Sequence, residues 1–368
     1  MSGVTDESSY SPITGRPIRW GILATGKIAH AFARDLVQVA DAELVAVGSR
    51  RPASAQAFAE EYGGLAGRPI RAHGSYASLV EDPEVDVVYI ATPHALHLAD
   101  ALLAFEHGKH VLCEKPLTIA VGEAEQMVAA ARERGLFLME AMWTACHPGV
   151  RALRRRLAAG EFGTPRHVHA ELGFVVRADP SDRMLNPDLG AGALLDMGIY
   201  PLTFAHLILG EAQGLTGQAV LAGSTTGDAA IDLSVAMTGA YAGGALATMH
   251  ASMTSWSSAS AAIATDRGRI DVPEFHHPTR ITFTPKAELA DWTAEGAPLQ
   301  PVEIEPDEPV IGRGYGNEAL EVGRCLREGL LESPLVPHAQ TLTLMRQMEQ
   351  IRRLTGIRYP GERVGRSS

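Results

Sequence analysis

Apolar residues in the first 140 positions occur in short runs, and each run is followed by a segment with helical spacing. Ile18–Leu23 and Val85–Ile90 are runs of this kind, and apolar residues recur at helical intervals from Ile28 to Leu36. Apolar strands that alternate with amphipathic helices are typical of a parallel sheet covered on both faces, so the pattern predicts a doubly wound α/β domain. We expect its strands at 18–23, 44–47, 85–90, 110–113 and 136–141, and its helices at 28–36, 52–62, 94–107 and 121–134.

The pattern changes after Trp143. Between 212 and 285, short strands separated by Gly, Thr and Ser follow one another without helices, which is typical of an antiparallel sheet. Val168–Phe174 alternates apolar with polar residues, like a strand with one face in solvent. We therefore predict two domains, residues 1–142 and 143–368, with the C-terminal helices of the second free to pack back on the first. Helices of this second part are expected at 148–159, 191–209, 316–330 and 339–354.

Charge and hydropathy narrow the classes of function. The chain has 368 residues, with 32 basic and 43 acidic side chains, and a formal net charge of -11. Nucleic-acid binding depends on clustered Lys and Arg, so this balance argues against a nucleic-acid partner. The most apolar long stretch, Gly190–Gly210, is interrupted by Asp196 and His206, so we expect no membrane span.

The cysteine content bears on the cellular compartment and on metal binding. Cys113, Cys146 and Cys325 are too few and too widely spaced for a disulfide framework or a thiolate zinc site. The polar first 17 residues lack the basic start and apolar core of a secretory signal. His94 and His97 are three apart but have no third metal ligand nearby in the pattern. We expect reduced thiols, a cytoplasmic protein and no bound metal.

A candidate phosphate-binding turn lies where the first expected strand meets the first expected helix. A dinucleotide needs backbone N–H groups at a helix N-terminus with no side chain in the way. Gly26 permits this approach and Ala29 fits the small third position of the G-x-G-x-x-G/A fingerprint, but Ala24 occupies the position of its first glycine. We expect the dinucleotide to contact Ala24, Thr25, Gly26, Lys27 and Ile28.

The end of the second expected strand bears on the choice of dinucleotide. A cofactor with a free ribose 2′-hydroxyl calls for an acidic residue about 20 residues after the turn. This chain has Ser49, Arg50 and Arg51 there instead. Two guanidinium groups can pair with a 2′-phosphate, so we favour NADP over NAD, although NAD binding and a simple solvated loop remain alternatives.

Polar residues also follow the next two strands. Thr92, Pro93 and His94 come after one of them, and Glu114 and Lys115 end the other. Ligands bind at the carboxyl ends of the strands in sheets of this kind, so these five residues are candidates for cofactor contact. Further along the chain, Asp196 and Tyr200 are four residues apart, which places them on one face of the expected helix.

These motifs resemble those of the Gfo/Idh/MocA family of oxidoreductases from Trp20 to Glu362. Within the family they are similar to the branch of dimeric dihydrodiol dehydrogenases and NADP-dependent xylose dehydrogenases. The resemblance implies an N-terminal Rossmann domain and a C-terminal α/β domain with an open, largely antiparallel sheet that forms a homodimer or a higher homo-oligomer. It also implies hydride transfer between a nicotinamide and a carbinol or carbonyl carbon. The resemblance to the family rests on four segments: Glu114-Lys115-Pro116, Met139–Trp143, the GAGALLDMGIY segment 190–200 and Arg358–Glu362.

The resemblance also implies roles for individual residues. Lys115 would touch the reacting oxygen, Tyr200 would be the general acid/base, and Asp196 would hold Lys115 or the substrate. His97 stands where relatives have a residue near the nicotinamide, Trp143 would line the substrate site, and a cis peptide bond is expected between Lys115 and Pro116. Ala145 occupies a position where relatives often carry an arginine, a role that Arg183 could take over.

The chemistry supports these roles independently. Oxidation of a secondary alcohol removes a proton from oxygen while a hydride leaves carbon. A free phenol has a pKa of about 10, which is too high for an efficient base at neutral pH. An adjacent ammonium such as Lys115 stabilises the phenolate of Tyr200 and lowers its pKa.

Three functions are consistent with the sequence. The leading one is an NADP-dependent dehydrogenase that acts on a sugar or a cyclic vicinal diol, with a small-molecule substrate as its partner. The second is a keto-sugar or dicarbonyl reductase that uses the same residues in the reverse direction. The third, a non-catalytic NADP-binding sensor or co-regulator, is disfavoured because Lys115 and Tyr200 are both present.

Overall fold

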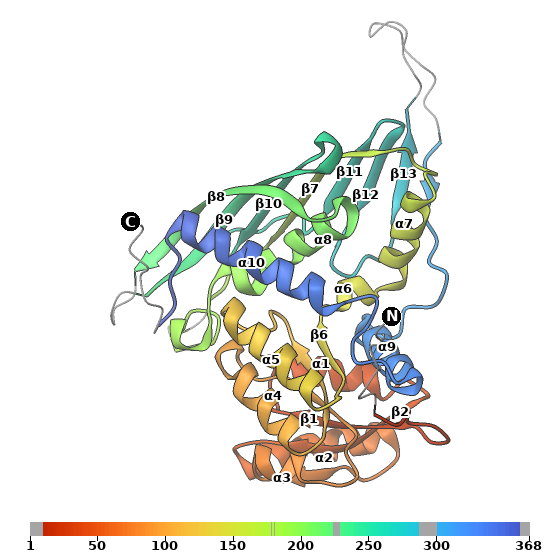
Figure 1. The fold of residues 1–368 in the computed structure, drawn as a ribbon, viewed down its shortest axis with the longest axis vertical. Helices are drawn as coiled ribbons and strands as arrows, with labels where there is room; N and C mark the ends of the chain where they lie inside the picture. The colour runs from red at the N-terminus through yellow and green to blue at the C-terminus, as the bar shows by residue number, and fades with distance from the viewer. Residues whose placement is uncertain (1–9, 178, 180, 224–228, 287–299, 361–368) are drawn as a thin grey trace, which may run out of the picture. The chain divides into compact units, whose positions relative to one another are not determined.

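The computed structural model describes residues 10–177, 179, 181–223, 229–286 and 300–360 (Figure 1). The expectations for the first nine residues, and for Gly361 and Glu362 of the C-terminal motif, lie outside this described part. The chain divides into two compact units: a first unit of residues 1–146 and 310–342, and a second unit of residues 147–309 and 343–368.

The first unit is built on a six-stranded sheet of order β3-β2-β1-β4-β5-β6, in which every neighbouring pair is parallel. This order and the alternating helices confirm the predicted doubly wound fold. The strands are β1 (Ile18–Leu23), β2 (Ala42–Gly48), β3 (Arg71–His73), β4 (Val87–Ile90), β5 (His110–Glu114) and β6 (Leu138–Ala141).

Helices pack on both faces of this sheet. Because parallel crossovers are right-handed, the helices after β1 and those after β4 and β5 lie on opposite faces. On one side α1 packs against α2 and α9, and on the other α4 packs against α3 and α5. The helices are α1 (Lys27–Leu36), α2 (Pro52–Ala66), α3 (Tyr76–Val80), α4 (His97–Glu106), α5 (Val121–Glu133), α6 (Trp143–Cys146) and α9 (Tyr315–Glu328).

The apolar runs supply the core between these layers. Trp20 of β1, Phe32 of α1 and Tyr89 of β4 are fully buried, and the ring of Phe32 stacks on that of Tyr89 with 3.8 Å between centroids. The strand and helix positions agree with the hydrophobic pattern to within a few residues. The pattern did not reveal β3 and α3, because a three-residue strand and a five-residue helix are too short to show a period.

The second unit is built on an eight-stranded sheet of order β14-β13-β12-β11-β7-β10-β9-β8. Its pairs are antiparallel except for β7 with β10, which confirms the mostly antiparallel sheet that the sequence predicts. The strands are β7 (Pro165–Gly173), β8 (Ala212–Gly223), β9 (Ala230–Tyr241), β10 (Leu246–Ser252), β11 (Ala261–Thr265), β12 (Gly268–Val272), β13 (Thr282–Pro285) and β14 (Val302–Glu303).

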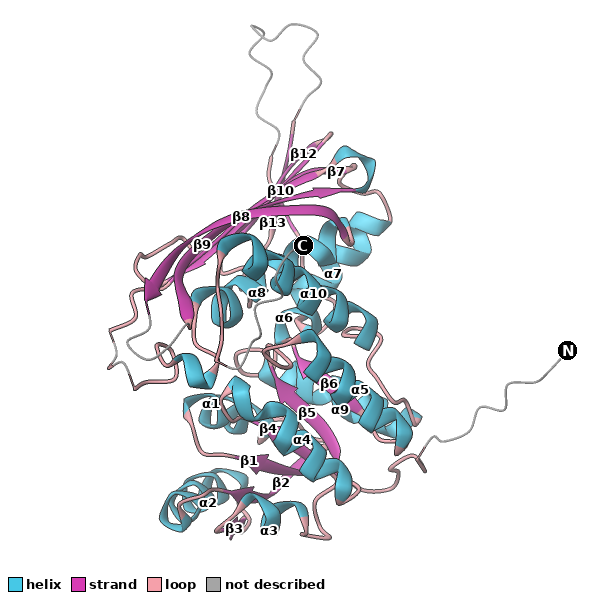
Figure 2. Cartoon of the chain, turned by 60° about the vertical axis from the view of Figure 1, so that its left-hand side comes forward, coloured by secondary structure: helices cyan, strands magenta, loops and turns pink. Residues whose placement is uncertain are grey.

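Helices α7 (Pro148–Ala158) and α8 (Ile199–Leu209) lie on one face of this sheet (Figure 2). Along β7 the buried Val168 and Ala170 alternate with His167 and His169, which are more exposed and reach the Thr248 hydroxyl on β10. The alternation is the one expected for a strand with one face in solvent. Helix α10 (His338–Thr355) is divided between the two units at residue 342.

One helical stretch is long and apolar enough to cross a membrane by length and composition alone. It runs over Pro187–Leu209, and 83% of its most apolar window is buried inside the protein. Such burial is typical of a core helix.

Candidate active site

The loops that carry the predicted cofactor contacts share one edge of the first sheet. Strands β2, β1, β4 and β5 are consecutive neighbours and run parallel, so their carboxyl ends lie side by side. Through those ends the sheet brings together four predicted segments: residues 24–28, 49–51, 92–94 and 114–115.

The turn between β1 and α1 has the geometry of a phosphate-binding loop. Gly26 is the N-cap of α1 in an extended conformation, no side chain caps the helix, and its first turn holds no acidic residue. A Cβ built on Gly26 would meet no atom within 4 Å, so the helix N-terminus is open to a ligand. These features fit the phosphates of a dinucleotide, which need exposed N–H groups and a positive helix end.

Ala24 is the unusual residue of this turn. Its φ of 88° lies in the left-handed region that glycine adopts readily and alanine does not. The fingerprint has glycine at this position, and the backbone takes the glycine-like conformation although the residue is alanine. Its N–H donates to the Gly48 carbonyl over 2.9 Å, which links the turn to the end of β2.

The two arginines after β2 stand at a second helix N-terminus. Arg51 is the N-cap of α2, with Pro52 as the first helical residue, and its N–H donates to the Ser49 hydroxyl over 3.3 Å. The charge of Arg50 acts on Asp100 in α4, whose pKa burial raises to about 6 despite a hydrogen bond from Thr92. A phosphate ester could be bound here by the Ser49 hydroxyl, by the guanidinium groups of Arg50 and Arg51 and by the N-terminus of α2.

Asp100 and His97 connect the loop after β4 to its surroundings. The Thr92 hydroxyl donates to Asp100 Oδ2 over 2.7 Å, a contact that the sequence analysis missed. The fully buried His97 ring has Nε2 2.9 Å from the Thr92 carbonyl, and Nδ1 3.1 Å from the Pro116 carbonyl and 3.2 Å from that of Leu117. Burial lowers the pKa of His97. His97 thus joins the loop after β4 to the loop after β5.

The Glu114-Lys115-Pro116 segment ends β5 with a carboxylate held in place. Tyr89 donates its hydroxyl proton to Glu114 Oε1, and the Lys115 N–H donates to Glu114 Oε2 over 3.2 Å. Lys115 itself is half-buried, and the peptide bond between it and Pro116 is cis, as expected. Glu114 therefore orients the backbone from which Lys115 projects.

Glu140 is a buried carboxyl that the sequence analysis did not single out. Its Oε1 accepts a 2.9 Å hydrogen bond from the Leu117 N–H, and its Oε2 accepts one of the same length from the Thr341 hydroxyl. Burial raises the pKa of Glu140 to about 7, although these two hydrogen bonds and the charge of Lys115 oppose the change. It fixes the loop two residues beyond Lys115. Its only signal in the sequence was an acidic residue inside an apolar strand.

Trp143, a predicted substrate contact, begins α6 in the first unit. Its ring stacks on that of Tyr315 at the start of α9, with 4.2 Å between centroids and an interplanar angle of 1°. The orientation of the indole is therefore fixed by packing.

The predicted helix over 191–209 differs from the structure at its start. Residues Leu194–Gly198 form a π-helix, and the α-helix begins only at Ile199. Asp196 lies in this π turn and Tyr200 in the α-helix that follows, so the regular α-helical spacing assumed between them does not hold. Such turns are rare and occur often at functional sites.

Asp196 and Tyr200 are both buried, and each has a neighbour in the second unit. Arg183 Nη1 lies 3.1 Å from Asp196 Oδ1 in an ion pair. The ring of Tyr200 packs against that of His276, with 5.5 Å between centroids. Arg183 was a predicted substrate contact, whereas His276 lies in a loop without a recognisable motif and had no predicted role.

The predicted site residues are thus divided between the units. The cofactor contacts, Lys115 and Trp143 belong to the first, while Arg183, Asp196 and Tyr200 belong to the second. The approach of Lys115 to Tyr200 stays a prediction. Among the residues that the structure describes, no group of three or more His, Cys, Asp or Glu side chains could hold a metal ion.

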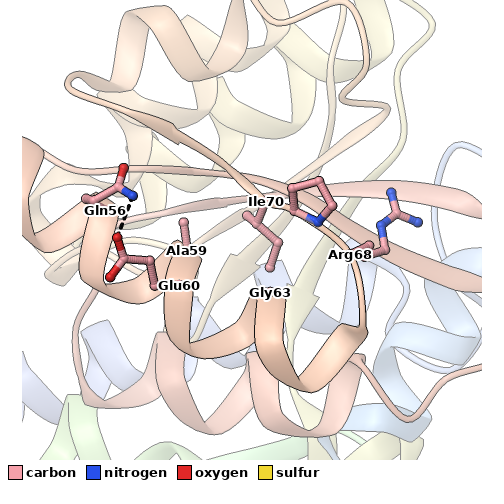
Figure 3. Close-up of a pocket in the computed structure, with 7 residues that line it drawn as sticks. Gln56, Ala59, Glu60, Gly63, Arg68 and Ile70 are labelled. Atoms are coloured by element: carbon pink, nitrogen blue, oxygen red, sulfur yellow. Dashed lines mark hydrogen bonds between the residues drawn. The ribbon is translucent and has the colours of Figure 1, made fainter.

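A surface pocket of about 330 Å³ lies elsewhere on the first unit, between α2 and the segment that leads to β3 (Figure 3). Gln56 donates to Glu60 there over 2.7 Å. The pocket contains none of the predicted site residues, so we assign it no part in the chemistry. It is lined by Gln56, Ala59, Glu60, Gly63, Arg68, Pro69 and Ile70.

An open helix N-terminus after β1, with polar loops at the same sheet edge, defines a dinucleotide-binding Rossmann unit. Family models agree: the oxidoreductase family with an NAD-binding Rossmann fold matches residues 18–142, and the GFO/IDH/MocA C-terminal domain matches residues 150–271. The chain belongs to the Gfo/Idh/MocA family of oxidoreductases.

Two characterised relatives align with nearly the whole chain. An NADP(+)-dependent D-xylose 1-dehydrogenase of Hypocrea jecorina is 34% identical, over 96% of this chain and 95% of its own. A trans-1,2-dihydrobenzene-1,2-diol dehydrogenase of Mus musculus is 33% identical, over 94% of this chain and 99% of its own. These relatives belong to the branch that the sequence motifs indicated.

Solved structures share the fold. The aldose-aldose oxidoreductase of Caulobacter crescentus has a TM-score of 0.79 at 23% identity, covering 93% of this chain and 98% of its own. A 3-ketoreductase of Actinomadura kijaniata, crystallised with NADP and TDP-benzene, has a TM-score of 0.75 at 24% identity, covering 92% and 98%. Both likenesses extend over the two units.

Proposed function

We propose that the protein is an NADP-dependent dehydrogenase that oxidises a secondary hydroxyl of a sugar or of a cyclic vicinal diol. The observation that carries the proposal is the position of Lys115, which leaves β5 at the same sheet edge as the open N-terminus of α1. The near full-length relatives that act on D-xylose and on a dihydrodiol support this substrate class.

The roles of the side chains follow from the chemistry of alcohol oxidation. A bound nicotinamide supplies the acceptor for the hydride that leaves carbon. Tyr200 takes the proton from the substrate oxygen, and Lys115 stabilises the charge on that oxygen and on the phenolate. Asp196 forms an ion pair with Arg183 and holds the substrate or Lys115 in position.

The preference for NADP rests on the residues after β2. Ser49, Arg50 and Arg51 offer a hydroxyl, two cations and the N-terminus of α2 to a 2′-phosphate. Arg50→Ala should weaken NADP binding about tenfold or more and leave NAD binding nearly unchanged, because only NADP carries the 2′-phosphate. Equal NADP affinity in the variant and the parent protein, measured by fluorescence titration, would contradict this assignment.

The catalytic assignment is tested by single substitutions. Aldoses, inositols and trans-diols are first screened with NADP and NAD by nicotinamide absorbance to find the best substrate. Lys115→Ala and Tyr200→Phe should each lower kcat by about a thousandfold or more while cofactor affinity stays close to that of the parent. A variant that keeps near-normal kcat on the best substrate removes its residue from the mechanism.

We also propose that the protein is a cytoplasmic homodimer joined through the sheet of the second unit. Support comes from apolar side chains left exposed on this sheet, Val220 on β8 at 61% and Leu246 on β10 at 55%, and from three buried free thiols, which suit a reducing compartment. Light scattering of the protein and of a Leu246→Asp variant tests the dimer, since a buried aspartate would favour the monomer. A monomeric parent protein would refute it.

A further inference from the structure

The segment that carries Asp196 and Tyr200 begins without a cap of its own. The π-helix starts at Leu194, and Ala193, its N-cap, makes no side-chain hydrogen bond. The first N–H groups of a helix have no partner within the helix, so another part of the fold must supply acceptors for them.

Asp232 on β9 supplies one of these acceptors from 38 residues away. It is fully buried, and its Oδ2 accepts a 2.7 Å hydrogen bond from the Leu194 N–H. A Cβ built on Gly192 would lie 2.5 Å from Asp232 Oδ1, and Gly192 has a φ of 124°, so the carboxylate packs directly against this glycine backbone. Asp232 thus acts as a remote N-cap, with a carboxyl oxygen at the first N–H of the π-helix.

Tyr359 holds the same turn from a different segment. Its hydroxyl donates to the Ala191 carbonyl over 2.6 Å, and its ring lies under the Arg352 guanidinium, 4.6 Å from the centroid. Arg358 pairs with Ala230 at the start of β9 in an isolated antiparallel bridge, so the segment that carries Tyr359 runs beside the strand that carries Asp232. These contacts give a structural role to Tyr359 of the C-terminal motif, to which the catalytic scheme gives none.

We propose that Asp232 and Tyr359 are positioning residues that fix the turn 190–194 and thereby the placement of Asp196 and Tyr200. The Asp196 N–H donates to the Gly192 carbonyl over 3.2 Å, so a shift at Gly192 passes directly to Asp196. Misplacement of a catalytic group by about 1 Å can cost a hundredfold in rate. The proposal rests on the catalytic role proposed for Tyr200.

The test compares variants that remove or keep the acceptor. Asp232→Ala removes the acceptor of the Leu194 N–H and should lower kcat about a hundredfold with KM changed less than about threefold. Asp232→Asn keeps a carbonyl oxygen in place and should restore kcat to within about fivefold of the parent protein. If the asparagine variant is as slow as the alanine variant, or if folded Asp232→Ala keeps kcat within about threefold, the proposal is wrong.

Tyr359→Phe tests the second contact and does not depend on the folding of Asp232→Ala. It should lower kcat about tenfold and speed hydrogen exchange over residues 190–200. The matched control is Tyr241→Phe, which deletes the hydroxyl of another buried tyrosine of the second unit and should change neither quantity by more than about twofold. Unchanged exchange and kcat in Tyr359→Phe would overturn the role of Tyr359.

The exchange measurement also separates this inference from the proposed function. Faster exchange over residues 190–200 in Tyr359→Phe and Asp232→Ala supports the cap whatever reaction the protein catalyses. Full activity of Tyr200→Phe would refute the catalytic assignment without affecting the exchange result. Faster exchange with unchanged kcat would show that the turn does not position the reacting groups.

Discussion

Lys115 and Tyr200 are held in place by two different kinds of structure. Lys115 directly follows a buried parallel strand, and the backbone contacts of Glu114 and Glu140 on either side of it fix the loop. Tyr200 follows a π turn whose start depends on Asp232 and Tyr359, which lie far away in the sequence. Lys115 is thus placed by its own strand and by Glu140 on the neighbouring strand β6, whereas the start of the segment that carries Tyr200 depends on partners 38 and 168 residues away.

The largest effect should come from Gly192→Ala in the second unit. A Cβ there would sit 2.5 Å from a carboxylate oxygen, in a conformation that alanine avoids. We expect the free energy of unfolding to fall by about 3 kcal/mol, from backbone strain and overpacking together. Urea denaturation measures it, and a variant as stable as the parent protein would mean that the turn is not rigidly held.

Gly26→Ala makes the same change in the first unit and should act differently. A Cβ there meets no protein atom within 4 Å, so the melting temperature should stay within about 1 °C. The methyl group would obstruct a phosphate, so the dissociation constant for NADP should rise about tenfold. Thermal unfolding and fluorescence titration are the measurements, and unchanged affinity would place the phosphates elsewhere.

Glu140→Gln tests the buried carboxyl behind Lys115. The unfolded chain has a glutamate pKa of about 4.3, and burial raises the folded pKa of Glu140 to about 7. Between these values the folded state binds more protons, so the contribution of Glu140 to stability falls as pH rises from about 4.3 through 7. Glutamine does not titrate, so the variant should gain stability relative to the parent protein by on the order of 2 kcal/mol between pH 5 and pH 8.

Urea midpoints at the two pH values give this difference. If the difference in stability between Glu140→Gln and the parent protein is the same at pH 5 and at pH 8, Glu140 does not titrate in this range. Glu123→Gln in the half-buried first turn of α5 is a suitable control, because its carboxyl also accepts a hydrogen bond from a backbone N–H, over 3.3 Å, but is less buried than that of Glu140.

The smallest effect is expected from Ala24→Gly. Glycine adopts a φ of 88° without the steric cost that alanine has there, but it also raises the conformational entropy of the unfolded chain. Because the two effects oppose each other, the net gain in the free energy of unfolding should be about 0.5 to 1 kcal/mol. Differential scanning calorimetry should show a slightly higher melting temperature. A lower one would mean that the alanine methyl group makes a compensating contact.

Much of the first unit could be predicted from its sequence because each element carries its own signal. Continuous apolar runs identified the strands, and the order of strands and helices placed Lys115 and Arg50 at one edge of the sheet. The contacts of Glu140, Asp232 and Tyr359 could not be predicted in this way. Each joins positions that are separated by 23 to 201 residues, and no periodicity encodes such a pairing.

The error at Asp196 and Tyr200 has a similar origin. Their spacing in the sequence is helical, but Asp196 lies in a π turn, which follows Gly192 and whose first N–H donates to Asp232. A pattern of apolar residues reports that a segment is helical and buried. It does not report how many residues each turn contains.

The surroundings of His97 have a consequence for its protonation. Carbonyl oxygens face both ring nitrogens, yet a neutral imidazole has one N–H to give, so one of the two sides lacks a donor. A second proton would provide a donor to each side at once. Burial lowers the pKa of His97, so the folded protein disfavours this second proton, and acidification should weaken the junction between the loops after β4 and β5.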